Sequence, residues 1–174
     1  MSTKILIYGF KPFQGLKENI TEKIIENIKN RKNLRKVVFP VKFEKKMFLN
    51  EIKEFEPDII LGLGLHPRGK KIRIERKAVN LKQFSKKDIP KPIYKNKPKY
   101  LFATLKLKRD KESWISYDAG KYVCNFSMYT ILEFTKNKNI KFAFLHIPKD
   151  YNLNKAVKFV GSKIDEIVKD LKLL

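Results

Sequence analysis

The residues best suited to nucleophilic or acid–base chemistry are few in this chain. Cys124 is the one cysteine among 174 residues, and His66 and His146 are the two histidines. A single cysteine excludes an internal disulfide bond and a cysteine-rich zinc site. Cys124 is therefore either a small buried residue or a nucleophile. A thiol nucleophile needs a general base, and a carboxylate that orients this base completes a catalytic relay.

Cys124 stands where a predicted helix begins. The turn-forming run Asp118–Gly120 precedes it, and apolar residues recur at helical spacing from Phe126 to Leu132 after it. A thiol at a helix N-terminus lies near unpaired N–H groups and the positive end of the helix dipole, and both favour the thiolate. The local sequence therefore favours a nucleophile, with a structural cysteine as the other interpretation.

His146 and Glu75 are the candidate partners of this thiol. His146 ends a predicted buried strand that begins at Phe142 and that Pro148 terminates. Because sites in open α/β sheets gather at the carboxyl ends of strands, His146 is placed where a general base is needed. Glu75 is an isolated acid in a strongly basic segment, where it either orients the imidazole or serves as an ordinary ion-pair partner.

Short apolar runs alternate with segments of helical period, which is the pattern of an α/β sheet with crossover helices. We expect a single domain over residues 1–174, because neither a repeat nor a linker divides the chain. Residues 82–99, with three prolines and no period, are predicted to form a loop. The expected strands are 4–9, 37–41, 59–65, 72–74, 100–107, 114–116 and 142–147, and the expected helices are 20–28, 47–55, 125–134 and 153–171.

The chain is strongly basic, because 40 Lys and Arg against 18 Asp and Glu give a net charge of +22. Residues 68–99 alone hold 13 basic residues and two acids. Such a charge attracts polyanions by long-range electrostatics. Apolar runs are shorter than a membrane span, and the N-terminal run is too short for a signal peptide. We therefore expect a cytoplasmic protein without a membrane partner.

Five segments stand in order along the chain at residues 8–15, 37–41, 64–80, 116–125 and 144–148. Together they resemble motifs of pyroglutamyl peptidase I, also called pyrrolidone-carboxylate peptidase. The segment 116–125, Ser-Tyr-Asp-Ala-Gly-Lys-Tyr-Val-Cys-Asn, is similar to that family's cysteine motif. Residues 64–67 together with residues 72–80 are similar to its glutamate motif, and residues 144–148 are similar to its histidine motif. The turn 8–15 and the strand 37–41 resemble its N-terminal elements. By this resemblance the chain is identified as a divergent, shortened member of the family.

The resemblance implies a three-layer α/β/α sandwich with a mixed, mostly parallel sheet. It also implies a cysteine peptidase that removes N-terminal pyroglutamate from peptides, with no metal or cofactor and with a homo-oligomer as a further expectation. Cys124 would attack the carbonyl carbon, His146 would transfer the proton, and Glu75 would orient His146.

The same resemblance implies a set of substrate-binding residues. Phe10 and Phe13 would form apolar walls around the flat lactam ring, although core packing is the alternative interpretation of both. The further implied pocket residues are Asn19, Tyr122 and Val123.

The chain departs from the family's pattern around the acid and in its length. Arg73 and Lys77 stand where the glutamate motif has a hydroxyl residue and an apolar residue, and Asp88-Ile89-Pro90 stands in place of an Arg-Ile-Pro segment. Residues 105–114 are too few for the expected crossover helix, so we expect an altered strand pairing there. The region after His146 lacks the family's longer insert. These departures bear on specificity more than on fold.

Two other functions stay open at this point. A related hydrolase with changed specificity would keep the catalytic residues and alter the pocket. A catalytically weak or inactive member would instead bind RNA or another polyanion through residues 68–99, with Phe84, Tyr94 and Tyr100 stacking among the lysines. A lysine-rich surface of a thermophile protein, with no binding role, explains the same charge.

Overall fold

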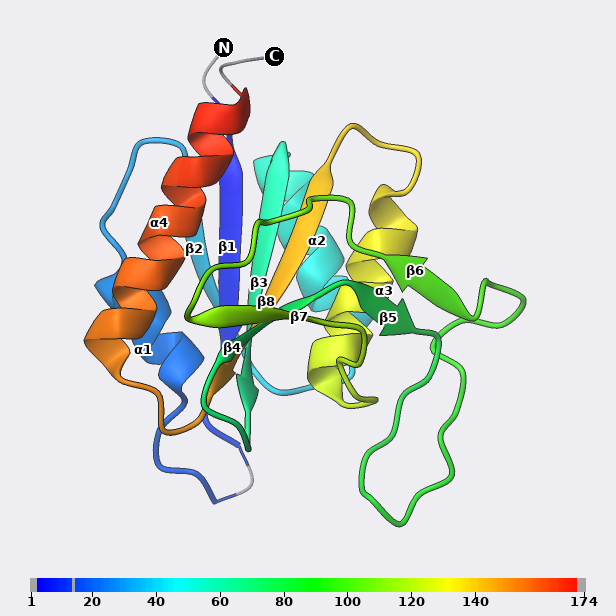
Figure 1. The fold of residues 1–174 in the computed structure, drawn as a ribbon. Helices are drawn as coiled ribbons and strands as arrows, with labels where there is room; N and C mark the ends of the chain where they lie inside the picture. The colour runs from blue at the N-terminus through cyan, green and yellow to red at the C-terminus, as the bar shows by residue number, and fades with distance from the viewer. Residues whose placement is uncertain (1–2, 14, 172–174) are drawn as a thin grey trace.

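Residues 3–13 and 15–171 are described in the computed structural model (Figure 1). They form a six-stranded sheet, a two-stranded sheet and four helices. The helices are α1 (Ile20–Asn27), α2 (Lys45–Phe55), α3 (Val123–Thr135) and α4 (Leu153–Leu171). The strands are β1 (Ile5–Phe10), β2 (Leu34–Phe39), β3 (Ile59–His66), β4 (Ile72–Glu75), β5 (Lys77–Val79), β6 (Tyr100–Phe102), β7 (Ser113–Ser116) and β8 (Lys141–Pro148).

The strands of the large sheet lie in the order β2-β1-β3-β8-β4-β7. Every neighbouring pair is parallel except β4 and β8, which run antiparallel. β8 comes late in the sequence, yet it lies inside the sheet and pairs with β3 along its whole length, from Ile59 opposite Lys141 to His66 opposite Pro148. The mixed, mostly parallel sheet expected from the resemblance is therefore confirmed.

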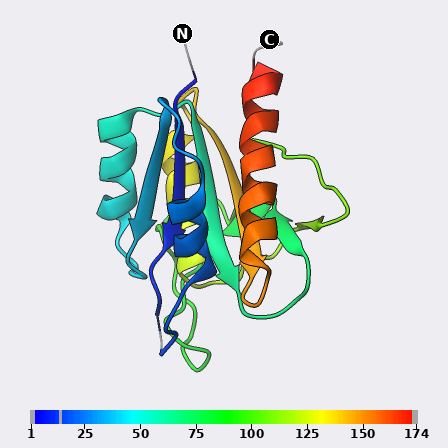
Figure 2. The same cartoon turned by 90° about the vertical axis from the view of Figure 1, so that its left-hand side faces the viewer.

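Successive residues of each central strand face opposite sides of the sheet, and each side is covered by two helices. In β1, Ile5 and Ile7 pack in the core beneath α1 and α4, whereas Leu6 and Tyr8 pack in the core beneath α2 and α3. Figure 2 shows the sheet with α2 on one side and α4 on the other. The three-layer α/β/α arrangement is confirmed. Within the described ranges, no helix is long and apolar enough to cross a membrane.

The segment 100–107 differs from its predicted single strand. Only Tyr100–Phe102 is a strand, and it pairs antiparallel with β5 in the separate two-stranded sheet. The rest leaves the sheet because it covers the core beneath α4, where Leu107 is buried and where Arg76 donates a hydrogen bond to the carbonyl of Leu107. Residues 103–112 cross this face as an irregular segment, and β7 begins at Ser113. No helix forms over residues 105–114, as predicted, and the altered strand pairing expected there stays a prediction.

The basic segment 82–99 is a loop, as predicted, and Figure 1 shows it as a long excursion away from the layers. Its base is closed by the buried side chain of Asn80. The Asn80 Oδ1 atom accepts hydrogen bonds from the N–H groups of Ile93 and Tyr94, and Nδ2 donates to the carbonyl of Tyr94. One amide therefore ties the residue before the loop to residues in the second half of the loop.

Replacing Asn80 with alanine tests this closure. Because one buried and two partly buried backbone groups lose their partner, we expect the free energy of unfolding to fall by about 2–3 kcal/mol. Tryptic cleavage within residues 82–99 should also accelerate. Urea unfolding and limited proteolysis measure the two effects, with Asn50→Ala, an exposed change on α2, as the matched control. Cleavage at the wild-type rate in Asn80→Ala would show that the loop does not depend on this amide.

Candidate active site

The candidate catalytic residues come from strands whose side chains alternate between the two faces of the sheet. On β8, Leu145 and Ile147 point into the core beneath α1 and α4, so His146 points to the opposite face, toward α3. On β4, Ile74 points into that same core, so Glu75 also faces α3. The antiparallel pairing of β4 and β8 thus brings together two side chains that are 71 positions apart in sequence.

His146 and Glu75 form a buried pair. The Nδ1 atom of His146 lies 2.8 Å from Oε1 of Glu75. An ionised carboxylate can only accept, so Nδ1–H is the donor and Nε2 is left for another partner. Glu75 is 0% exposed, and within the described residues its Oε2 atom has no hydrogen-bond partner. The buried negative charge therefore depends on His146 for its compensation.

Cys124 is the second residue of α3 and approaches His146 above a glycine of β3. A Cβ atom added to Gly64 would lie 2.7 Å from Sγ of Cys124 and 2.8 Å from Cδ2 of His146. Sulfur and imidazole therefore meet over Gly64, and a side chain there would push them apart. Gly64 was not predicted as a site residue. A glycine inside a buried strand is the sequence signal of such a close approach.

The electrostatics of the site act mainly on His146. Burial by itself would lower the pKa of His146, but the neighbouring Cys124 and Glu75 groups outweigh burial and raise the pKa to about 9. At neutral pH both nitrogens of His146 therefore carry a proton, and the side chain is an imidazolium. An imidazolium beside a sulfur at a helix N-terminus is the arrangement that a cysteine nucleophile needs.

Two hydroxyl groups, of Ser127 and Tyr8, form linked hydrogen bonds behind Cys124, and the sequence did not predict them. The hydroxyl of Ser127 donates to the carbonyl of Cys124 at 2.8 Å, and the hydroxyl of Tyr8 lies 2.9 Å from the Ser127 oxygen. Since Ser127 uses its hydrogen for the carbonyl, Tyr8 is the donor to Ser127. Burial raises the pKa of Tyr8, which keeps its hydroxyl protonated. These two hydrogen bonds fix the first turn of α3 against β1.

A second anchor starts from the residue after the cysteine. Asn125 donates hydrogen bonds to the carbonyls of Val79 and Leu81 and accepts one from the N–H of Val79. Because Cys124 and Asn125 are adjacent, the same helical turn positions both the thiol and β5. The start of the basic loop is thereby coupled to the site.

The five predicted substrate-binding residues take different positions. Phe10 is buried in the core beneath α2 and α3, as the packing interpretation has it, whereas Phe13 is half-buried in the turn after β1. Asn19 is buried, caps α1 and donates to a carbonyl of that turn. Tyr122 is partly exposed at the N-cap of α3, and Val123 is buried beside it. Substrate binding by these residues stays a prediction. Within residues 3–13 and 15–171, no three His, Cys, Asp or Glu side chains cluster as metal ligands do.

Comparison with known proteins places this chain in a family. A sequence profile described as pyroglutamyl peptidase matches residues 3–158. The chain belongs to the pyroglutamyl peptidase family. Pyrrolidone-carboxylate peptidase of Thermococcus litoralis is 35% identical to it, over 83% of this chain and 76% of the relative. The enzyme of that name from Pyrococcus furiosus is 34% identical, over 83% of this chain and 80% of the relative.

Solved structures of the pyroglutamyl peptidase family confirm the fold. Pyrrolidone carboxyl peptidase from Thermococcus litoralis superposes with a TM-score of 0.88 and 26% identity, covering 98% of this chain and 95% of the other. A variant of the Pyrococcus furiosus enzyme gives a TM-score of 0.86 and 28% identity, covering 97% and 99%. The family resemblance inferred from the motifs is therefore confirmed over nearly the whole chain.

Gly64→Ala tests the close approach of sulfur and imidazole. Its methyl group would separate the two groups, so the sulfur would lose its imidazolium partner. We expect alkylation of Cys124 by iodoacetamide at neutral pH to slow by about tenfold. Gly161→Ala on α4, where an added Cβ atom meets nothing within 4 Å, is the matched control and should keep the wild-type rate. Equal rates in both variants would contradict the proposed contact.

Proposed function

We propose that this chain removes N-terminal pyroglutamate from peptides, with Cys124 as the nucleophile, His146 as the proton carrier and Glu75 as the carboxylate that orients His146. Membership of the pyroglutamyl peptidase family supports the reaction. The observation that carries the assignment of roles is the buried pair of Glu75 and His146. The other imidazole nitrogen, Nε2 of His146, lies on the side of Cys124.

In the first half-reaction, Sγ of Cys124 attacks the carbonyl carbon that joins pyroglutamate to the next residue. A C–S bond forms, and the carbonyl oxygen takes the negative charge. When this intermediate collapses, the imidazolium of His146 gives its proton to the leaving nitrogen and the C–N bond breaks. A pyroglutamyl thioester remains on Cys124, and the shortened peptide leaves.

In the second half-reaction, water attacks the thioester and His146 takes the proton of that water. The C–S bond breaks, and free pyroglutamate leaves. The oxyanion of both steps needs N–H donors, and the first turn of α3 is their proposed source. Helix N-termini carry unpaired N–H groups, and Tyr122 adds no side-chain cap at this one.

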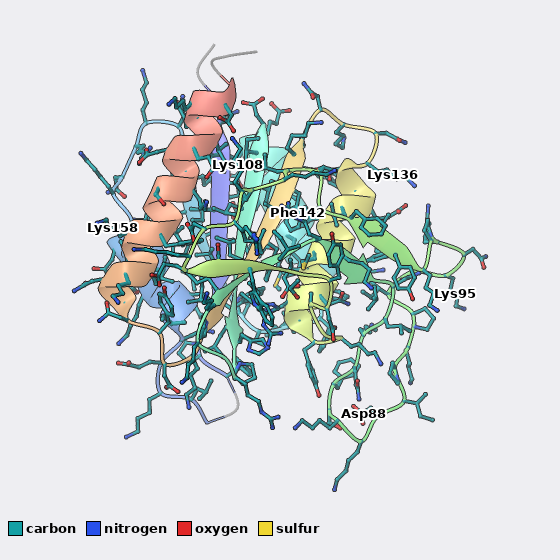
Figure 3. The ribbon with its side chains drawn as sticks, in the orientation of Figure 1. Asp88, Lys95, Lys108, Lys136, Phe142 and Lys158 are labelled. Carbon is teal, nitrogen blue, oxygen red and sulfur yellow. The ribbon has the colours of Figure 1, made fainter. Side chains whose placement is uncertain are left out.

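The alternative of polyanion binding is not supported by the comparisons, whose matches are named as peptidases. The lysines are also spread over the molecule: Figure 3 shows Lys95 on the loop, Lys136 after α3 and Lys158 on α4, all at the periphery. This spread favours the interpretation of a solvated basic surface. Self-association and a cytoplasmic location stay predictions, and light scattering tests the first.

Cys124→Ala is the direct test of the nucleophile. Because thioester formation becomes impossible, release of a fluorogenic amine from a pyroglutamyl amide should fall by about a thousandfold or more. The midpoint of thermal unfolding should stay close to that of the wild type. Ser162→Ala, an exposed change on α4, should keep both turnover and midpoint. Turnover at the wild-type rate in Cys124→Ala would refute the assignment.

The raised pKa of His146 sets an alkaline limit on turnover. Below about pH 9 the imidazole holds the proton that the leaving nitrogen needs, and above that pH the proton is lost. Turnover of a peptide substrate should therefore decline as the pH rises through about 9. Alkylation of Cys124 by iodoacetamide needs no proton donor and should continue undiminished. A parallel decline of both rates would contradict the role given to His146.

A further inference from the structure

One rung of the sheet places an arginine beside the proposed catalytic pair. Arg73 on β4 lies opposite His146 on β8 and opposite Trp114 on β7. Its neighbour Ile74 points into the core beneath α1 and α4, so Arg73 points to the face that His146 occupies. Directly opposed residues of an antiparallel pair have Cβ atoms about 5 Å apart, so the arginine side chain starts next to the imidazole.

The guanidinium of Arg73 is held in place but has no anionic partner. Its Cζ atom lies 5.4 Å from the centre of the Trp114 ring. In the part of the chain that the structure describes, no Asp or Glu oxygen lies within ion-pair distance of it. Glu75, on the same face of β4, pairs with His146 instead. Arg73 is half-buried, and its guanidinium is stacked on Trp114 without an acidic partner. Such a guanidinium is pre-organised for an external anion.

His66 is a further neighbour of His146. Its ring centre lies 5.7 Å from that of His146. Burial lowers the pKa of His66, and the charge of Arg73 acts in the same direction, so the His66 imidazole is uncharged at neutral pH. Arg73 is therefore a permanent positive charge that lies beside the imidazolium of His146.

The strand order decides on which side of the nucleophile Arg73 lies. Phe13, the predicted lactam wall that is only half-buried, belongs to the turn after β1, on one side of β3. Arg73 on β4 lies on the other side, beyond His146 on β8. His146 delivers a proton to the leaving nitrogen, so the leaving peptide must lie on the side of His146. The residue that follows pyroglutamate is thus directed toward Arg73.

We propose that Arg73, stacked on Trp114, binds a carboxylate of the residue that follows pyroglutamate in the substrate. This inference rests on the proposed peptidase function and narrows its substrate class. The carboxylate is either the terminal group of a pyroglutamyl dipeptide or the side chain of Asp or Glu. A guanidinium binds such a group through two parallel N–H···O bonds. The arrangement also explains why a large cation stands where the family's motif has a hydroxyl residue.

Two matched pairs of substrates test the subsite and distinguish the two sources of the carboxylate. Pyroglutamyl-alanine against its amide reports the terminal group, and pyroglutamyl-glutamate amide against pyroglutamyl-glutamine amide reports the side chain. In the wild type we expect kcat/KM to favour the carboxylate member of at least one pair by about tenfold or more. In Arg73→Gln this ratio should fall to about one, and in Arg73→Lys, which keeps the charge but loses the planar fork, it should be intermediate.

Arg109→Gln is the matched control, because it removes the same charge from an exposed position in the segment before β7 and should keep the wild-type ratio. Wild-type turnover of the amides with a ratio near one would overturn the subsite and leave the peptidase assignment intact. A ratio that persists in Arg73→Gln, or that falls equally in Arg109→Gln, would overturn it as well.

Calorimetric titration of Cys124→Ala with the same four compounds separates this inference from the proposed function, because it measures binding without turnover. Tighter binding of the carboxylate member, lost in the double variant Cys124→Ala/Arg73→Gln, supports the subsite even if the wild type hydrolyses none of the compounds. Equal binding of both members of each pair, including no binding of either, overturns it.

Discussion

A carboxylate without exposed surface is the constraint on which this site depends. Burying an isolated ionised carboxylate costs several kcal/mol, and one hydrogen bond does not compensate for it unless the donor is also charged. The contact of Glu75 with His146 therefore has two effects at once. It makes the buried acid tolerable, and it fixes which imidazole nitrogen carries a proton. The tautomer follows from this pair, and together with Cys124 the pair raises the pKa of His146.

The second requirement is a short distance between the sulfur of Cys124 and the imidazole of His146. A glycine in the sheet makes this distance possible. The bare backbone at Gly64 lets α3 approach the sheet until sulfur and imidazole meet. Helix position is then fixed from two directions, by the polar chain from Tyr8 through Ser127 and by the contacts of Asn125 with β5. Each of these contacts is made by a residue that does not itself take part in the chemistry. The precision of the site is thus a property of packing around the first turn of α3.

The sequence was enough to predict the catalytic candidates, because one cysteine and two histidines leave few choices, and strand ends are recognisable from apolar runs. The alternation of strands and helices followed from periodicity in the same way, whereas the three layers were implied by the family resemblance. The prediction of a strand over 100–107 was wrong beyond Phe102, because Leu107 is buried by covering the core and not by pairing in the sheet. The position of Arg73 beside His146 could not be predicted from the residues near it in sequence. Its neighbours His146 and Trp114 are set by strand pairing over long sequence separations, which no nearby residue encodes.

The place of β8 in the sheet has a consequence for synthesis on the ribosome. β8 lies between β3 and β4, yet it is the last strand to be made. Until it emerges, the half-sheet of β2, β1 and β3 and the pair of β4 and β7 have no common partner, and each presents an unsatisfied edge. The nascent chain therefore stays exposed to wrong pairing or to chaperones through most of its translation. Sheet closure and completion of the reactive centre then occur together, since the strand that joins the two halves is the one that carries His146.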